Sequence, residues 1–194
     1  MGAGDGAGNL LMMKEGGGGC VERAGAGGVS GSCWSYASAA ADYDGDGDID
    51  LYVANDYGSN QLYRNEGDGR FVDVALEMGV LVQGNGMGVA WCDLNNDGVL
   101  DLYVANMSST AGNRILDRLK EDVDPEIHAQ LKKSAAGNTI FVREGEIFRA
   151  LAREAGGVGA SWAWSPVLCD FDLDGRTDVF VSNSYVTGDL PHDT

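Results

Sequence analysis

The residues best suited to chemistry in this 194-residue chain are aspartates that recur at alternate positions in three short loops. Each loop has the pattern Asp-x-(Asp/Asn)-x-Asp-Gly-x-x-Asp. Oxygen ligands at alternate positions, closed by a glycine turn, suit a hard cation such as calcium. We therefore predict three metal-binding loops, named loops one, two and three, at residues 42–50, 93–101 and 170–178.

The positions within each loop have separate predicted roles. Positions 1, 3, 5 and 9 offer side-chain oxygens, and position 7 offers a backbone carbonyl, while the glycine at position 6 permits the sharp turn. About three calcium ions are expected in all. The predicted ligands are Asp42, Asp44, Asp46 and Asp50 with the carbonyl of Asp48 in loop one; Asp93, Asn95, Asp97 and Asp101 with the carbonyl of Val99 in loop two; and Asp170, Asp172, Asp174 and Asp178 with the carbonyl of Arg176 in loop three.

The loops differ from EF-hands, and one alternative interpretation needs no metal. Position 12, where an EF-hand needs a bidentate glutamate, is Val53, Val104 or Val181. The alternative is an Asp/Gly-rich hairpin turn. Without metal, the five carboxylates of loop one would repel one another without compensation, and so would the four carboxylates of loop three. Loop two is expected to bind more weakly, because Asn95 replaces one ligand charge.

Strand-like segments flank every loop. The segment after each loop is short, β-branched and aromatic, and ends at an asparagine; the segment before it keeps small residues at alternate positions. The segments after the loops are 50–55, 101–106 and 178–183, and those before them are 36–41, 87–92 and 164–169. A hairpin unit at 60–72 is repeated at 138–148 and begins in degenerate form at 9–16.

The spacing of these units predicts the architecture. Asp42 to Asp93 is 51 residues, and Asn9 to Asn60 is also 51. A period near 50 with four strands per unit is typical of a β-propeller blade. We predict an all-β fold, a partial β-propeller of four-stranded antiparallel blades with about three blades' worth of strands and one helical insertion. The predicted parts are a Gly-rich disordered start at 1–8, then repeats over 9–188 (half-blade 9–24, blade 34–75, blade 86–151 with a helical insertion at 107–137, half-blade 160–184), and a tail at 189–194.

The insertion contains one convincing helix. Asp124 can cap it, Pro125 suits its first position, Ile127 and Leu131 share a face, and Gly137 can end it. This insertion is the best candidate for a surface that binds a specific partner.

The two half-blades leave alternatives open. They can join as one blade, which gives three, but known rings have about four to eight. The chain is therefore either a fragment of a longer propeller or an open arc that pairs with a second copy.

Composition excludes some classes of partner. The net charge is −17, so nucleic acid is not an expected partner. No apolar run reaches the length of a membrane span, and the residues from Met1 onward lack the basic and apolar regions of a signal peptide. The four cysteines are sparse; Cys92 and Cys169 are predicted to be small core positions.

These residues resemble FG-GAP/VCBS repeats, the calcium-loop blades of integrin α-subunit propellers, and within them the ASPIC/UnbV-associated, cartilage acidic protein-like group. The resemblance covers nearly all of 9–188, but no ASPIC/UnbV domain follows, and Gly16 to Cys20 departs from the expected turn. It implies a calcium-binding propeller of about seven blades, extracellular, periplasmic or on the cell surface, and commonly a binding module. The segments that carry it are 46–56, 60–71, 102–114 and 162–164.

Three functions compete. The first is a non-catalytic, calcium-stabilised module that binds a protein or glycan, with a role in adhesion. The second is the propeller portion of a carbohydrate-active or redox enzyme. The third is a structural arc used for assembly. The chain has only His128 and His192 as histidines and lacks a Gly-x-Ser-x-Gly elbow, so we expect no enzyme activity.

Overall fold

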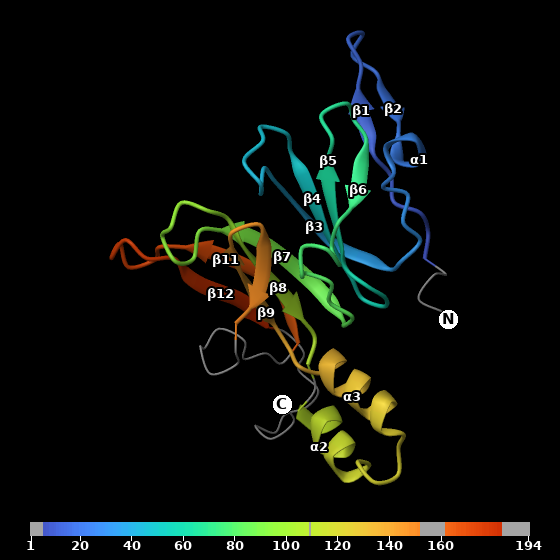
Figure 1. The fold of residues 1–194 in the computed structure, drawn as a ribbon, viewed down its shortest axis with the longest axis vertical. Helices are drawn as coiled ribbons and strands as arrows, with labels where there is room; N and C mark the ends of the chain where they lie inside the picture. The colour runs from blue at the N-terminus through green and yellow to red at the C-terminus, as the bar shows by residue number, and fades with distance from the viewer. Residues whose placement is uncertain (1–5, 109, 152–161, 184–194) are drawn as a thin grey trace.

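The computed structural model of the chain describes residues 6–108, 110–151 and 162–183. Its strands form two four-stranded and two two-stranded sheets, all antiparallel (Figure 1). Within the described residues no sheet closes into a barrel. The predicted all-β, partial-propeller fold is therefore confirmed.

Each four-stranded sheet is one blade, with strands in chain order across the sheet. A metal-loop candidate joins the first two strands of each blade, and the ladder starts at its ends, with Ala41 opposite Asp50 and Cys92 opposite Asp101. The first blade contains β3 (Ser35–Ala41), β4 (Asp50–Asn55), β5 (Gln61–Asn65) and β6 (Phe71–Asp73). The second contains β7 (Gly86–Cys92), β8 (Asp101–Asn106), β9 (Thr139–Glu144) and β10 (Ile147–Ala150).

The two half-blades are separate hairpins. Because they form different sheets, they do not join as one blade in the described part of the chain. The first hairpin is β1 (Met12–Lys14) with β2 (Cys20–Glu22), followed by the short helix α1 (Ala24–Gly27). The last hairpin is β11 (Ala163–Cys169) with β12 (Asp178–Asn183), joined by loop three.

The hydrophobic core lies between successive blades. Strand β7 contacts β3 on one side and β11 on the other, as inner strands do around a propeller axis. A Cβ added to Gly88 would clash with the Trp164 carbonyl oxygen and lie 2.6 Å from Pro166 Cδ. This close approach explains the small residues of the inner strands. The largest buried cluster, between the two complete blades, includes Tyr52, Leu62, Val80, Leu102, Val104 and Phe141.

A buried tyrosine and asparagine pair repeats in both blades. Asn60 Nδ2 donates to Tyr52 Oη at 3.2 Å, and Asn138 Nδ2 donates to Tyr103 Oη at 2.7 Å. The same two asparagines accept backbone N–H bonds at the ends of β4 and β8. These bonds satisfy polar groups that would otherwise be buried without partners.

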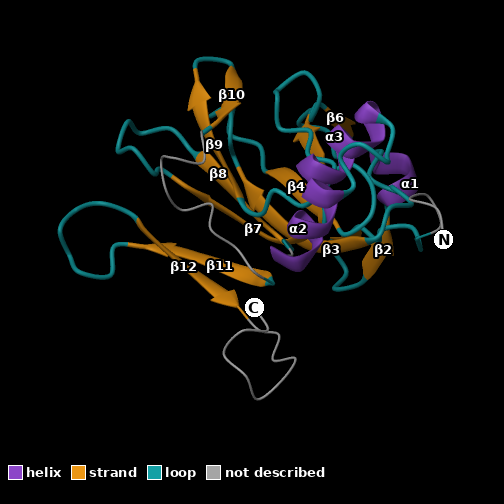
Figure 2. Ribbon diagram, turned by 90° about the horizontal axis from the view of Figure 1, so that it is seen from below, coloured by secondary structure: helices purple, strands orange, loops and turns teal. Residues whose placement is uncertain are grey.

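The insertion holds two helices, α2 (Thr110–Arg118) and α3 (Pro125–Ser134), which lie beside each other (Figure 2). Asp124 Oδ1 accepts bonds from the N–H groups of Glu126 and Ile127, so the predicted cap is confirmed. The α2 helix was not predicted, since Gly112 lowers its intrinsic propensity. It is held to α3 by the ion pair of Lys132 with Asp117 at 2.7 Å. No helix in the described ranges has the length and apolar character needed to cross a bilayer.

Some predictions fall outside the described residues, namely those for Met1–Asp5, for 152–161 and for 184–194, which include His192 and the tail. Gly6, in the predicted disordered start, donates its N–H to the Ser32 carbonyl at 2.9 Å.

Cys92 is half-buried, whereas Cys169 is exposed, so the core prediction is wrong for Cys169. In the described part of the chain no further blade follows the β11–β12 hairpin that carries it.

Candidate metal-binding loops

The aspartate at position 1 folds each loop around its own carboxylate. Asp42 accepts the N–H groups of Gly45 at 2.8 Å and Gly47 at 3.0 Å. Asp93 and Asp170 each accept the N–H groups of positions 5 and 6, at 2.8–3.1 Å. The bond from the position 6 N–H therefore recurs in all three loops, whereas the second bond comes from position 4 in loop one and from position 5 in loops two and three.

Position 4 of every loop has a left-handed backbone, which the sequence did not reveal. Its φ is +80° at Gly45, +60° at Asn96 and +62° at Leu173. Glycine and asparagine tolerate this region, but leucine does not do so readily. The turn around Leu173 therefore holds its backbone in this unfavourable conformation, while the side chain is exposed.

In the two complete blades the aspartate at position 9 is buried and ties the loop to the third strand. Asp50 is fully buried, and its two oxygens accept the N–H groups of Tyr43 at 3.2 Å and Asn65 at 2.8 Å. Asp101 is also fully buried and accepts those of Leu94 at 3.0 Å and Arg143 at 2.9 Å. The pattern predicted a ligand here but not this second role.

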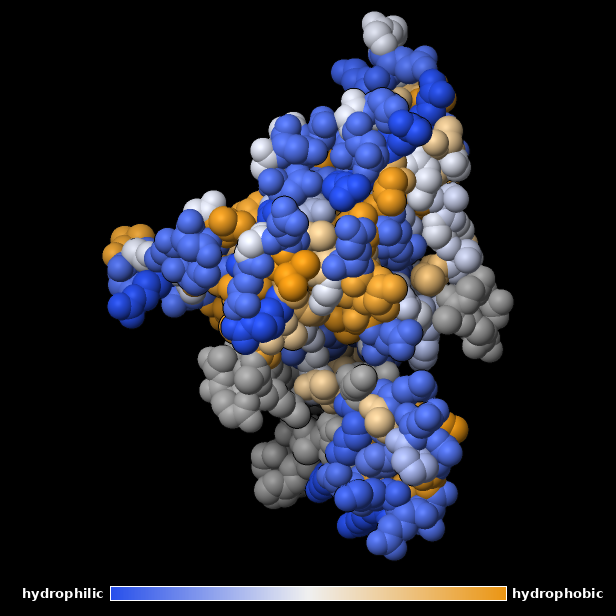
Figure 3. Space-filling model, in the orientation of Figure 1, coloured by the Kyte–Doolittle hydropathy of each residue, from blue (hydrophilic) through white to orange (hydrophobic). Residues whose placement is uncertain are grey.

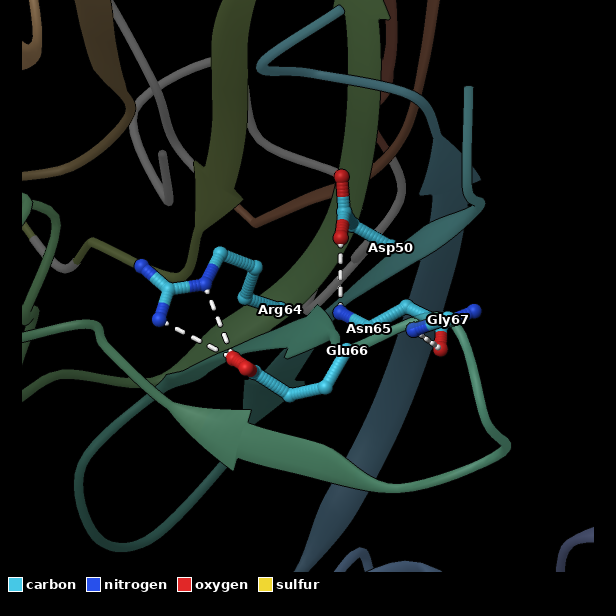
Figure 4. A network of polar contacts seen from close by, with 5 residues as sticks. All are labelled: Asp50, Arg64, Asn65, Glu66 and Gly67. Atoms are coloured by element: carbon cyan, nitrogen blue, oxygen red, sulfur yellow. Dashed lines mark hydrogen bonds and ion pairs between the residues drawn. The ribbon is translucent and has the colours of Figure 1, made fainter. Parts of the chain in front are cut away.

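Figure 4 shows how this contact anchors the β5–β6 hairpin. The Asp50 carboxylate points at the Asn65 N–H, and the Asn65 side chain accepts the Gly67 N–H at 3.1 Å (Figure 4). Arg64 pairs with Glu66 beside it at 3.0 Å. The end of loop one and the hairpin turn thus form one hydrogen-bonded unit.

Burial also changes the acidity of the position 9 carboxyls. Removal from water raises the pKa of Asp50 to about 6, although the bonds from Asn65 and Tyr43 act in the opposite direction. Burial likewise raises the pKa of Asp101. In both cases nearby loop aspartates add to the rise.

The structure brings together part of each predicted ligand set. Oxygens of Asp42, Asp44 and Asp50 lie within 4.8 Å of one another in loop one. Those of Asp170, Asp172 and Asp174 do so in loop three. Two oxygens bound to one calcium ion are at most about 5 Å apart, because each Ca–O distance is about 2.3–2.6 Å. Both groups therefore fit a single calcium ion.

The remaining predicted ligands lie outside these two groups, including Asp46 and Asp178. Loop two forms no such group of three acidic side chains in the described residues. There the Asn95 amide donates to Asp97 Oδ2 at 2.8 Å. The carbonyl ligands predicted at Asp48, Val99 and Arg176 remain predictions.

In loops one and two the side chain at position 2 packs the loop onto the next blade or hairpin, and this role was also missed. Tyr43 is buried and stacks on Trp91, with ring centroids 5.9 Å apart, and Phe148 lies 5.9 Å away. Leu94 packs into the core beside the last hairpin, whereas Phe171 is 57% exposed. Burial raises the pKa of Tyr43 to about 12, so its hydroxyl stays neutral.

Hydrogen bonds also join the loop ends of neighbouring blades. Asn96 Nδ2 donates to the Gly175 carbonyl at 2.8 Å, and Thr177 Oγ1 donates to the Asp93 carbonyl at 3.1 Å. Loop one is joined to the second blade through strand β9, where the Arg143 guanidinium donates to the Tyr43 carbonyl and lies 5.4 Å from the centre of the Tyr43 ring. The three loops thus form a connected edge of the molecule.

Comparison with known proteins agrees with this geometry. Residues 42–104, which include loops one and two, all of β4 and most of β8, match the family model of the FG-GAP-like repeat. The predicted resemblance to FG-GAP repeat proteins is therefore confirmed.

Known proteins carry a similar segment. A stretch of 58 residues is 45% identical to cartilage acidic protein 1 of Xenopus tropicalis and 43% identical to that of Homo sapiens. The stretch is 29% of this chain and 9% of either relative. The chain thus matches only a small part of those proteins.

Proposed function

We propose that this chain is a calcium-binding β-propeller repeat module in which the metal is structural. The observation that carries the proposal is the convergence of Asp42, Asp44 and Asp50 in a turn whose position 6 N–H donates to the position 1 carboxylate in all three loops. Unneutralised carboxylates at these distances repel one another strongly, so a divalent cation offsets a cost that the fold otherwise bears.

The residues that would hold the ion follow from the geometry. In loop one they are Asp42, Asp44 and Asp50, and in loop three Asp170, Asp172 and Asp174. In loop two, Asp93, Asn95 and Asp97 supply less charge, which supports weaker binding there. When bound, the ion supplies positive charge that holds the turn between a blade's two inner strands.

We propose a non-catalytic role in binding a protein or glycan outside the cytoplasm. The relatives are named for cartilage and for acidity, and this chain shares a strongly acidic composition with a net charge of −17. A propeller portion of a carbohydrate-active or redox enzyme is the alternative, but no specific contact favours it.

Further repeats are the proposed neighbours of the open sheets. Met12 on β1 and Phe180 on β12 are 54% and 56% exposed, on strands that complete only half a blade. Light scattering after size-exclusion chromatography tests the competing idea: a discrete dimer would favour a second copy as the neighbour.

Calorimetric titration with calcium tests the metal proposal. We expect about three ions per chain in the wild type. The double variant Asp42→Asn/Asp44→Asn should lose one, while Asp122→Asn, an exposed charge between α2 and α3, should lose none. Equal stoichiometry in all three proteins would contradict the assignment of the site.

A further inference from the structure

A groove lies between helix α3 and the end of the first blade. Its volume is about 700 Å³, within the range of small-ligand and peptide sites. It is at the far end of β4 from loop one, beyond Asn55. The side chains used below are Asp56, Tyr57, Gln61, Asp73 and Leu131.

The helical side of the groove presents apolar groups to solvent. Leu131 lines the groove and is 43% exposed, and Ile127, one turn away on α3 and outside the lining, is 52% exposed. The two helices contact each other through polar groups, with the His128 ring 2.8 Å from the Leu116 carbonyl and Lys132 paired with Asp117. Figure 3 shows hydrophobic residues, in orange, at the edge of the otherwise hydrophilic surface of helices α2 and α3. The apolar face is therefore available to a partner.

The opposite wall continues the apolar surface. Tyr57 follows β4 and is 60% exposed. A large aromatic ring opposite an aliphatic side chain is a common anchor for a side chain from a partner.

The charged side chains that line the groove are both carboxylates, Asp56 and Asp73. Asp56 and Asp73 each use one oxygen, accepting the Asn85 side-chain N–H and the Ala75 backbone N–H, both at 3.1 Å. Gln61 Oε1 is buried and has no hydrogen-bond partner in the described part of the chain. The lining contains no lysine, arginine or histidine. A ligand that donates several hydrogen bonds and carries positive charge complements this wall.

We propose that this groove docks a segment of a partner protein that carries an arginine beside an aliphatic side chain. The guanidinium pairs with Asp56 and Asp73, because a planar group with five donors suits carboxylates. The aliphatic side chain packs between Tyr57 and Leu131. The inference rests on the proposed binding role but is independent of metal in the loops.

Nuclear magnetic resonance titration with a defined peptide tests the groove. The probe is acetyl-Leu-Arg-Leu-amide, and its control replaces arginine with citrulline, which keeps the shape but removes the charge. The isotope-labelled protein is saturated with calcium. We expect the arginine peptide to shift the amide signals of Tyr57, Gly58 and Asn85, and the citrulline peptide to shift them far less.

Variants separate the two parts of the contact. Asp56→Asn and Leu131→Ala should each weaken binding of the arginine peptide about threefold to tenfold. Ile115→Ala removes a similar aliphatic group that is 55% exposed on α2 and outside the groove lining, so it should leave binding unchanged. Because the substituted side chains are at least partly exposed, amide spectra of the free variants should show an intact fold.

Several results would overturn the inference. Equal shifts with both peptides would do so, as would shifts confined to the aspartate loops or no shift at peptide concentrations of about 5 mM. Concentration-dependent broadening of the groove signals without peptide would also do so, because it would make a second copy of the chain the occupant. If calorimetry finds no calcium binding but the peptide still docks, the metal proposal fails and this one stands.

Discussion

The carboxylate of Asp50 accepts a hydrogen bond from the backbone N–H of Asn65 at 2.8 Å. This bond links the last residue of loop one to the end of the third strand of the same blade. Asp101 makes the equivalent bond to Arg143 in the second blade. The closing aspartate of the pattern is therefore part of the fold as well as a candidate ligand.

Substituting Asp50 by alanine should destabilise the protein even without metal. The buried N–H group of Tyr43 and the half-buried N–H group of Asn65 would lose their acceptor, at a cost of about 2–4 kcal/mol in unfolding free energy. Urea denaturation of the metal-stripped protein measures this. Asp42→Ala is the control, because its bonds are to exposed loop N–H groups and should be worth about 1 kcal/mol. Equal losses in the two variants would refute the structural role of Asp50.

Acid should have opposite effects on the metal-stripped and the calcium-loaded protein. The folded-state pKa of Asp50, about 6, is above its ordinary value of 3.8, and that of Asp101 is also raised. The folded state then binds more protons than the unfolded state, so stability rises as pH falls from about 7 to about 5. With calcium, protons compete with the ion and stability falls. Thermal unfolding across this range measures both. A metal-stripped protein that only loses stability would contradict the expectation.

The position 2 side chain should matter only where a following blade covers it. Tyr43→Ala empties a buried aromatic site and should cost about 3–5 kcal/mol. Phe171→Ala, at a position that is 57% exposed, should cost less than about 1 kcal/mol. Denaturant titration of the two variants gives the comparison. Similar losses would show that the packing between blades is not as described.

Loops two and three should influence each other through Thr177. Thr177→Val keeps the shape of the side chain but removes the hydrogen bond to the Asp93 carbonyl. We expect the calcium affinity of loop two to fall about twofold to tenfold, as measured by calorimetry. The calcium affinity of loop one should be unaffected, because loop two has Leu100 at the position that Thr177 occupies in loop three. An unchanged calcium affinity at loop two would contradict the predicted coupling between the two loops.

Local pattern was enough to predict the loops and the strands beside them. The segments 50–55, 101–106 and 178–183 are strands with the predicted boundaries, because β-branched and aromatic residues follow a glycine turn in each case. The cap of α3 by Asp124 was likewise readable, since it depends on neighbours in sequence.

What the sequence did not reveal depends on distant partners. The dual role of Asp50 needs Asn65, and the role of Tyr43 needs Trp91, on the next blade. Helix α2 depends on its contacts with α3 more than on propensity. The carboxylates of Asp42, Asp44 and Asp50 come together without that of Asp46, and this grouping depends on the three-dimensional shape of the whole loop.

Thermal unfolding with calcium and with a chelator tests the central claim most directly. An ion that binds only the folded state stabilises it by about 2.7 kcal/mol at a concentration 100 times its dissociation constant. We predict a melting temperature several degrees higher in calcium, and a smaller rise for Asp42→Asn/Asp44→Asn. A wild-type melting temperature that is the same in calcium and in chelator would contradict the account.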